Sequence, residues 1–110
     1  MILYEVTYIL KDHEYEKRFA DFMIDRHLLD LYQTGCFLSV SFAKTQEAAT
    51  YKATFYLKDK KMMDKYINQY SASLRKGVTE KFPQTGIEFF RVFSYCLFFK
   101  SEQTTQSRKI

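Results

Sequence analysis

The first ten residues alternate between two kinds of side chain. Ile2, Tyr4, Val6 and Tyr8 fall on one side of an extended chain, while Glu5 falls on the other. A period of two predicts a β-strand with one face buried.

The apolar positions that follow recur at helical spacing. Asp12 can cap a helix running from about His13 to Gln33. One arc of that helix holds Tyr15, Phe19, Phe22, Met23 and Leu29, and a second patch holds Ile24, Leu28 and Leu31. Two patches predict that the helix bends or contacts two surfaces. Gly35 stands where a helix commonly ends on a left-handed residue.

The second half of the chain repeats this order. Residues 36–43 and 51–58 alternate again and are typical of a hairpin. Asp59 then begins a helix with an apolar stripe made of Met63, Tyr66, Ile67, Tyr70, Leu74 and Val78. Pro83 and Gly86 interrupt it. Residues 87–100 form a β-prone stretch longer than a usual strand, so we expect its end to extend past its own sheet.

The order βαββαβ predicts an α+β, ferredoxin-like domain. In this fold a four-stranded antiparallel sheet, of strand order 4-1-3-2, carries two helices on one face. The chain has 110 residues, which suits one domain over residues 1–100. Residues 101–110 are polar and are expected to form a flexible tail.

Alternation also assigns the two faces of the sheet. The face expected under the helices holds Ile2, Tyr4, Val6, Tyr8, Leu38, Val40, Phe42, Ala53, Phe55, Leu57, Phe90 and Val92. The other face mixes aromatic and charged side chains, which is typical of a protein interface. We predict a two-fold dimer through Glu5, Phe37, Tyr56, Phe89, Arg91, Phe93 and Tyr95. Glu5 and Arg91 are expected to pair across neighbouring strands; a half-exposed face with scattered aromatics is the alternative.

Composition changes this picture little. Aromatic residues make up 18% of the chain, a load that favours a partner surface. The formal net charge of +4 permits binding of anions without arguing for it. No leading segment resembles an export signal and no apolar run approaches a membrane span, so we expect a cytoplasmic protein with two free thiols.

His27 and Cys36 are the candidate reactive side chains. His27 can act as a general base or a ligand, or it can be a structural imidazole bonded to a backbone carbonyl or near the end of its helix. Alternation places Cys36 with the core, which favours a small buried hydrophobe over a nucleophile. Cys36 and Cys96 fall on opposite edge strands, beyond disulfide reach within one chain.

Other kinds of site find little support. His13 and His27 stand 14 residues apart and no Cys-x-x-Cys occurs, so no metal site is expected. The three glycines form no phosphate loop, and we expect no cofactor. RNA-recognition modules share the βαββαβ order, but here the third strand offers Lys52, Thr54 and Tyr56 without their glycine-containing signature. Nucleic acid is therefore a disfavoured partner.

Several motifs together resemble a known family. They are "YEVT" at residues 4–7, the spacing of Phe19, Phe22, Met23 and His27, Thr34-Gly35 followed by Phe37, and then Tyr66, Leu74-Arg75, Phe82 and Arg91. Over residues 1–95 the chain resembles a family of short bacterial proteins of unknown function in the dimeric α/β-barrel, ferredoxin-like superfamily. That family often has tryptophan where this chain has Phe19 and Phe22, and proline where it has Leu29.

The resemblance implies a homodimer whose sheets face each other to form a barrel, and it assigns no reaction. The superfamily includes cofactor-independent monooxygenases, lactone isomerases and haem-degrading enzymes, with pockets between helices and sheet. Our leading hypothesis is a homodimer that binds a small apolar or anionic molecule, or a non-catalytic interaction module. The alternative is a monooxygenase- or isomerase-like enzyme in which His27 is the base, Tyr4, Tyr8 and Tyr70 line the pocket and Arg75 orients an anion. A weak nucleic-acid binder is the second alternative.

Overall fold

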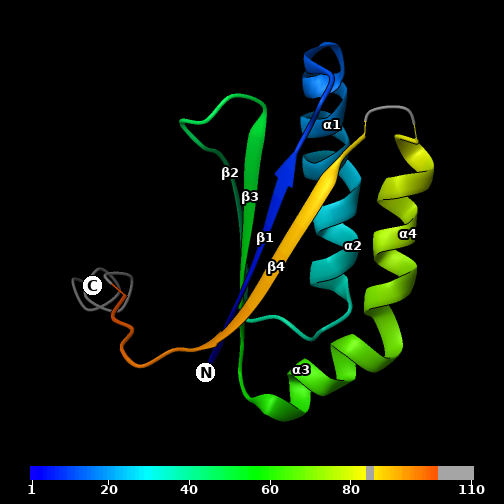
Figure 1. Cartoon of the computed structure of the whole chain (residues 1–110). Helices are drawn as coiled ribbons and strands as arrows, with labels where there is room; N and C mark the ends of the chain where they lie inside the picture. Colours follow the sequence, from blue (N-terminus) through cyan, green and yellow to red (C-terminus); the bar gives the residue numbers. More distant parts are fainter. Residues whose placement is uncertain (84–85, 102–110) are drawn as a thin grey trace, which may run out of the picture.

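The sheet has the strand order that the sequence predicts. The computed structural model describes residues 1–83 and 86–101 (Figure 1). Its strands are β1 (Ile2–Ile9), β2 (Ser39–Lys44), β3 (Thr50–Leu57) and β4 (Glu88–Tyr95). They are antiparallel and lie in the order β2-β3-β1-β4. This arrangement confirms the ferredoxin-like fold.

The helices are each interrupted by a π-helical turn. The first comprises η1 (His13–Tyr15), α1 (Glu16–Phe22), the π turn η2 (Met23–His27) and α2 (Leu28–Gln33). The second comprises α3 (Lys60–Tyr66), the π turn η3 (Ile67–Ser71) and α4 (Ala72–Lys81). Asp12 and Asp59 begin them as predicted, since each carboxylate accepts a backbone N–H at 3.0 Å.

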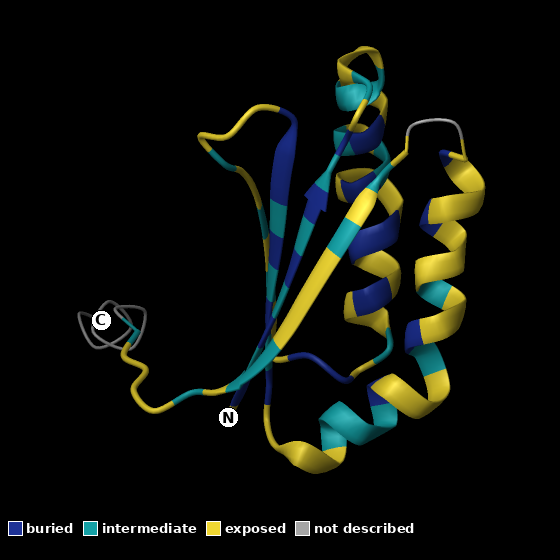
Figure 2. Cartoon of the chain, viewed as in Figure 1, coloured by how far each residue is buried: buried dark blue, intermediate teal, exposed yellow. Residues whose placement is uncertain are grey.

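The helices cover one side of the sheet, and the core lies between these two layers (Figure 2). Along β1 every second side chain is buried, beginning with Ile2, as the alternation predicts. Phe19 and Met23 reach the sheet from the first helix, and Tyr66 and Val78 reach it from the second.

Each π turn changes which helical positions face the sheet. Leu29 was expected in the apolar arc but is 53% exposed, whereas His27 is buried. In the second helix Ile67 was expected in the stripe but is exposed, and Ser71 is buried in its place. The reason is that a π turn has more residues per turn than an α-helix, so the positions after it rotate relative to a 100° pattern.

The first helix ends as the Thr-Gly pair predicts. Gly35 has a φ of +77°, and the Thr34 hydroxyl donates to the Leu31 carbonyl oxygen at 2.7 Å. Cys36 is buried, as predicted, and both Cys36 and Cys96 are free thiols.

The predicted facing of β4 is wrong. Tyr8 pairs with Phe89 and Val6 pairs with Arg91, so the β4 side chains that share the helix-covered side are Phe89, Arg91, Phe93 and Tyr95. Phe90 and Val92, expected in the core, lie on the open side and are 54% and 56% exposed. Each face of this strand carries both apolar and polar side chains, with Phe90 and Val92 beside Glu88 and Ser94 on one face and Arg91 among aromatic residues on the other, so alternation alone cannot choose between them.

Two further expectations about the faces need correction. Phe37 is buried against Tyr4 and Phe55, and Leu38 is exposed. Both residues precede β2, so the strand alternation does not extend to them. Glu5 pairs with Lys52 of β3 at 2.6 Å rather than with Arg91. Of the residues predicted for the dimer interface, the open side therefore carries Glu5 and Tyr56.

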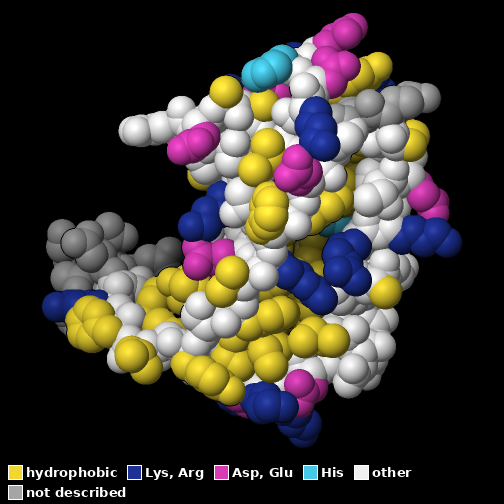
Figure 3. Space-filling model, in the orientation of Figure 1, with side chains coloured by type: hydrophobic (Ala, Val, Ile, Leu, Met, Phe, Trp, Pro, Cys, Tyr) yellow, Lys and Arg dark blue, Asp and Glu magenta, His cyan; other side chains and the backbone are white. Residues whose placement is uncertain are grey.

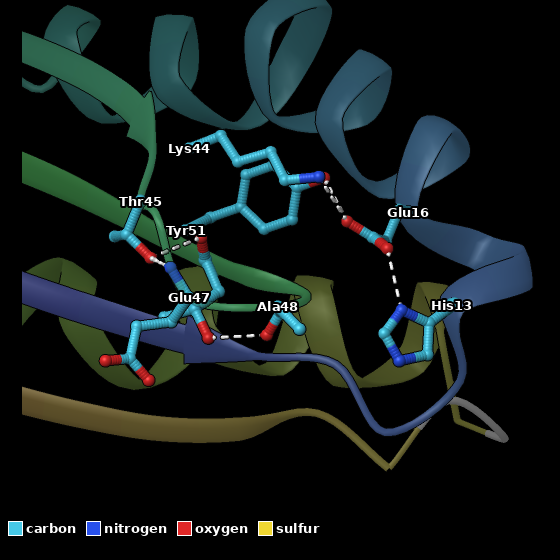
Figure 4. A network of polar contacts seen from close by, with 8 residues as sticks. His13, Glu16, Lys44, Thr45, Glu47, Ala48 and Tyr51 are labelled. Carbon is cyan, nitrogen blue, oxygen red and sulfur yellow. Dashed lines mark hydrogen bonds and ion pairs between the residues drawn. The ribbon is translucent and has the colours of Figure 1, made fainter.

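A polar cluster ties the first helix to the β2–β3 hairpin (Figure 4). Glu16 accepts a hydrogen bond from the Tyr51 hydroxyl at 2.8 Å and lies 3.2 Å from the Lys44 ammonium. His13 contacts its other carboxylate oxygen at 3.1 Å. The Tyr51 hydrogen bond, followed by that of Lys44, lowers the pKa of Glu16. Burial, followed by the bond to Glu16, raises the pKa of Tyr51 to about 12.

The chain leaves the sheet on the side away from the helices (Figure 1). Beyond β4 the segment 96–101 has no regular structure, in keeping with an end that extends past the sheet. Leu97 and Phe98 are 95% and 83% exposed, while the Phe99 ring lies 5.3 Å from that of Tyr56. The predicted tail lies outside the described residues apart from Ser101. No helix in the described part of the chain has the length and apolar character to cross a membrane.

Candidate functional site

A cavity lies between the sheet and the two helices. It has a volume of about 80 Å³. Its lining consists of Tyr4, Val6, Tyr8, His27, Leu31, Phe55, Tyr66, Arg75, Val78, Phe89 and Arg91. The exposed members of this set lie on α4 and β4, so the cavity opens between these two elements. Figure 3 shows basic side chains gathered around a hollow on this face of the molecule.

Tyrosine side chains form much of the interior wall. Tyr4 and Tyr8 come from β1, whose alternation directs both toward the helices, and Tyr66 comes from the end of α3. Burial raises the pKa of Tyr8 and of Tyr66, and the neighbouring Tyr4 raises both further. These phenols therefore stay protonated and offer hydroxyl groups rather than phenolates.

His27 is the last residue of the π turn η2, and this turn directs the imidazole toward the cavity. The imidazole is 6% exposed and stacks on Phe22, with ring centroids 5.8 Å apart. Burial lowers its pKa to about 4, against a smaller opposing effect of Asp30. Among the described residues the ring has no hydrogen-bond partner. Hence the site contains a neutral imidazole with a nitrogen available to a ligand.

Arg75 and Arg91 border the opening from opposite sides. Arg91 donates a hydrogen bond from Nη1 to Oγ of Ser71 at 2.8 Å. Its guanidinium carbon also lies 5.9 Å from the centre of the Phe93 ring. Ser71 is the buried last residue of η3, so the second π turn positions this arginine much as the first positions His27.

The structure brings most of the predicted pocket residues together. His27, Tyr4, Tyr8 and Arg75 all line the cavity. Tyr70 does not, because it lies in a separate surface depression with Asp30, Gln33, Thr34, Gln69, Ser73 and Leu74. A regular helix would place Tyr70 one turn from Tyr66 on the same side, but the η3 turn intervenes.

Sequence reasoning missed several members of the site. Tyr66 was assigned to the apolar stripe, whereas Arg91 and Phe89 were assigned to the dimer interface. The register of β4 against β1 decides their side of the sheet, and no local pattern reveals it. Ser71 was not singled out, although a serine in an apolar helix stripe is a signal of a buried hydrogen bond.

The arrangement suits binding of a polar molecule with an apolar body. It supplies an acceptor at His27, hydroxyl groups from tyrosines and cationic donors from two arginines, all around an apolar interior. In residues 1–83 and 86–101 no group of three or more histidine, cysteine or acidic side chains is placed to hold a metal ion.

Comparisons with known proteins agree with this fold. The sequence model of a family described as a domain of unknown function, DUF4286, matches residues 1–96. No curated protein sequence matches the chain. A solved dimeric ferredoxin-like protein from an uncultured marine organism has a TM-score of 0.72 at 12% identity, covering 90% of this chain and 97% of its own.

Two solved monooxygenases are also similar in structure. An antibiotic biosynthesis monooxygenase has a TM-score of 0.68 at 11% identity, covering 89% of this chain and 100% of its own. The monooxygenase from ActVA-Orf6 of Streptomyces coelicolor, solved with nanaomycin D, has a TM-score of 0.63 at 10% identity, covering 91% and 92%. At such identities the likeness concerns the fold alone.

Proposed function

Because this chain belongs to the DUF4286 family of unknown function and has a ferredoxin-like fold, we propose from its own geometry that it is a homodimeric small-molecule-binding protein. The ligand site is the cavity between the sheet and the helices, which opens between α4 and β4. The observation that carries this proposal is an imidazole that is only 6% exposed, that has no hydrogen-bond partner among the described residues, and that lies beside open space and beneath two arginines. None of the fully enclosed side-chain nitrogen and oxygen atoms in the described residues lacks a partner, so the ring nitrogens of His27 are accessible from the cavity and can bind a ligand there.

The size of the cavity limits the ligand. A cavity needs a volume of roughly 10–15 Å³ to hold one water molecule. The 80 Å³ available therefore accommodates about five to eight non-hydrogen atoms inside, with further atoms at the opening. A compact molecule is favoured over one that needs a pocket of roughly 300 Å³ or more.

The test is a titration of ¹⁵N-labelled protein with compact fragments, both neutral and charged. We expect shifts at the backbone amides of His27, Val78 and Phe89. The Val6→Leu/Val78→Leu variant, whose larger side chains fill the cavity, should show none of these amide shifts on addition of the fragments. Val40→Leu makes the same substitution at a residue outside the cavity lining and should show the same amide shifts as the parent protein. Shifts confined to other surfaces would contradict the proposed site.

We propose that two copies of the chain associate through the open side of the sheet, the side that the helices do not cover. Exposed apolar residues there are Phe90 and Val92, and the apolar segment Leu97 to Phe99 adjoins it through the contact of Phe99 with Tyr56. Exposed apolar side chains gathered on one side of a sheet are typical of an interaction site. The dimeric neighbour in the comparisons supports the choice of a second copy as the partner.

An enzyme is the second candidate, because His27 also has the features of a catalytic acceptor. A cavity remains beside the imidazole, and a ligand hydroxyl bound there could transfer a proton to the free nitrogen. The low pKa makes His27 a weak base, so an acidic phenol is the substrate type it suits. Oxygen uptake and product analysis with a panel of phenols, comparing the parent protein with His27→Gln, test this. Equal turnover by both proteins would argue against it.

A further inference from the structure

The opening of the cavity carries positive charge without a counter-ion. Neither Arg75 nor Arg91 forms an ion pair with an acidic side chain in the part of the chain that the structure describes. Several lysines, in contrast, form ion pairs with acidic side chains. These pairs are Lys11–Glu88, Lys17–Asp21, Lys44–Glu16, Lys52–Glu5, Lys60–Asp64 and Lys76–Glu80. The described lining of the cavity also contains no carboxylate. An anion at this opening would meet two cations and no like charge.

Arg91 is held in place before any ligand arrives. Its hydrogen bond to Ser71 uses one guanidinium donor, and Ser71 is 2% exposed and therefore fixed by the packing around it. The remaining donors of a guanidinium form a planar fork that matches the two oxygens of a carboxylate. Arg75 lies on the facing helix, so a carboxylate between the two elements can contact both.

Below the arginines the walls are mainly aromatic. Five of the lining residues are Tyr4, Tyr8, Phe55, Tyr66 and Phe89. Aromatic side chains pack well against a planar ring in offset or edge-to-face geometry. The 80 Å³ of the cavity is about half of the roughly 150 Å³ that encloses a benzene ring completely, so one six-membered ring is the largest body that enters it, with part of the molecule in the opening.

We infer that the ligand is the carboxylate of a single aromatic ring, bound with its carboxylate between Arg75 and Arg91 and its ring inside the cavity. This inference rests on the proposed binding function and names its ligand class. A ring hydroxyl that reaches the interior would donate to the free nitrogen of His27. Hydroxybenzoates are therefore the preferred members of the class.

Calorimetric titrations with four matched probes test the inference. The probes are benzoate, 4-hydroxybenzoate, the uncharged benzamide, and cyclohexanecarboxylate, which keeps the charge and loses the aromatic ring. We expect 4-hydroxybenzoate to bind most tightly, benzoate next, and the other two at least tenfold more weakly than benzoate. Affinity for benzoate should fall as salt is raised.

Variants assign the effect to the arginines. Arg75→Gln and Arg91→Gln each remove a charge at an exposed position and should weaken benzoate binding at least tenfold. Arg18→Gln removes the same charge from α1, outside the cavity, and should change the affinity less than twofold. His27→Gln should remove most of the advantage of 4-hydroxybenzoate over benzoate.

The possible failures are distinguishable. If benzamide binds as tightly as benzoate, or if both arginine variants keep full affinity, the ligand class is wrong and the binding site stands. If none of the probes binds, and neutral fragments also leave the amides of His27, Val78 and Phe89 unshifted, the inference and the proposed function fail together.

Discussion

Arg91 and Ser71 connect the two layers of the molecule at the edge of the sheet. The Nη1 atom of Arg91, on β4, donates to the Oγ atom of Ser71, at the end of η3, over 2.8 Å. The serine is buried and the arginine is exposed, so the bond holds an outward-facing cation against an inward-facing hydroxyl. The geometry of the cavity opening therefore depends on a residue of the opposite layer.

Removing this hydrogen bond should have a small effect on stability. For Ser71→Ala we expect the free energy of unfolding to fall by about 1 kcal/mol, because Arg91 is exposed and can bond water instead. Ser73→Ala, at an exposed site of α4, should change it by less than about 0.5 kcal/mol. Urea unfolding followed by circular dichroism provides the comparison. Equal values for both variants would show that the bond does not contribute.

The stability of the protein should fall in mild acid because of His27. Its pKa is about 4 in the folded protein and near 6.5 in the unfolded chain. The unfolded state therefore binds the proton first as the pH falls from 6.5 toward 4, and stability is lost over that range. It is fully present above pH 6.5. The loss reaches at most about 3 kcal/mol.

Urea unfolding of the parent protein and of His27→Gln between pH 4 and pH 7.5 measures this effect. The variant should show a shallower decrease with falling pH. NMR titration of the His27 ring should give a midpoint near 4. A midpoint near 6.5 would contradict the burial of the imidazole.

The oligomeric state should depend on the open side of the sheet. Light scattering at micromolar concentration should give about twice the chain mass of 13.2 kDa. Phe90→Glu/Val92→Glu places charges on the open side and should give the mass of one chain. Ile24→Glu changes a residue that is 56% exposed on the first helix and should leave the dimer intact. Arg91→Ala should also leave it intact, since Arg91 lies on the helix-covered side.

Two glycines should respond to alanine in opposite directions. Gly35 has a φ of +77°, where a Cβ costs about 1 kcal/mol, so Gly35→Ala should destabilise the fold by that amount. Gly77 lies within α4, and the space that an alanine methyl group would occupy there is open, so Gly77→Ala should stabilise by about 0.5–1 kcal/mol. Thermal unfolding of both variants measures the difference. An unchanged or higher melting temperature for Gly35→Ala would contradict the role of Gly35 as the end of the helix, and a lower one for Gly77→Ala would contradict the open space at that position.

Local sequence patterns predict the elements of this fold better than they predict which residues meet. Asp12, Asp59 and Gly35 mark helix ends through their own chemistry, so their positions could be identified without tertiary information. The side of the sheet that Arg91 occupies depends on the pairing of β4 with β1, which is a long-range choice. The burial of Ser71 depends on a π turn, and the apolar spacing assumed a regular helix.

The π turn at Ile67–Ser71 means that the number of residues in the second helix matters as much as their identity. Each residue of an α-helix advances the chain by about 100° around its axis. A π turn holds one residue more than regular winding would, so deleting one residue from it would restore an α-helix and leave the residues beyond it facing as they do now. Val78 would stay in the core and Arg75 would stay at the opening, whereas the position of Ser71, and with it the hydrogen bond to Arg91, would change. In this protein a difference of one residue in length is thus a route by which a related chain can change one support of the ligand site and keep the fold.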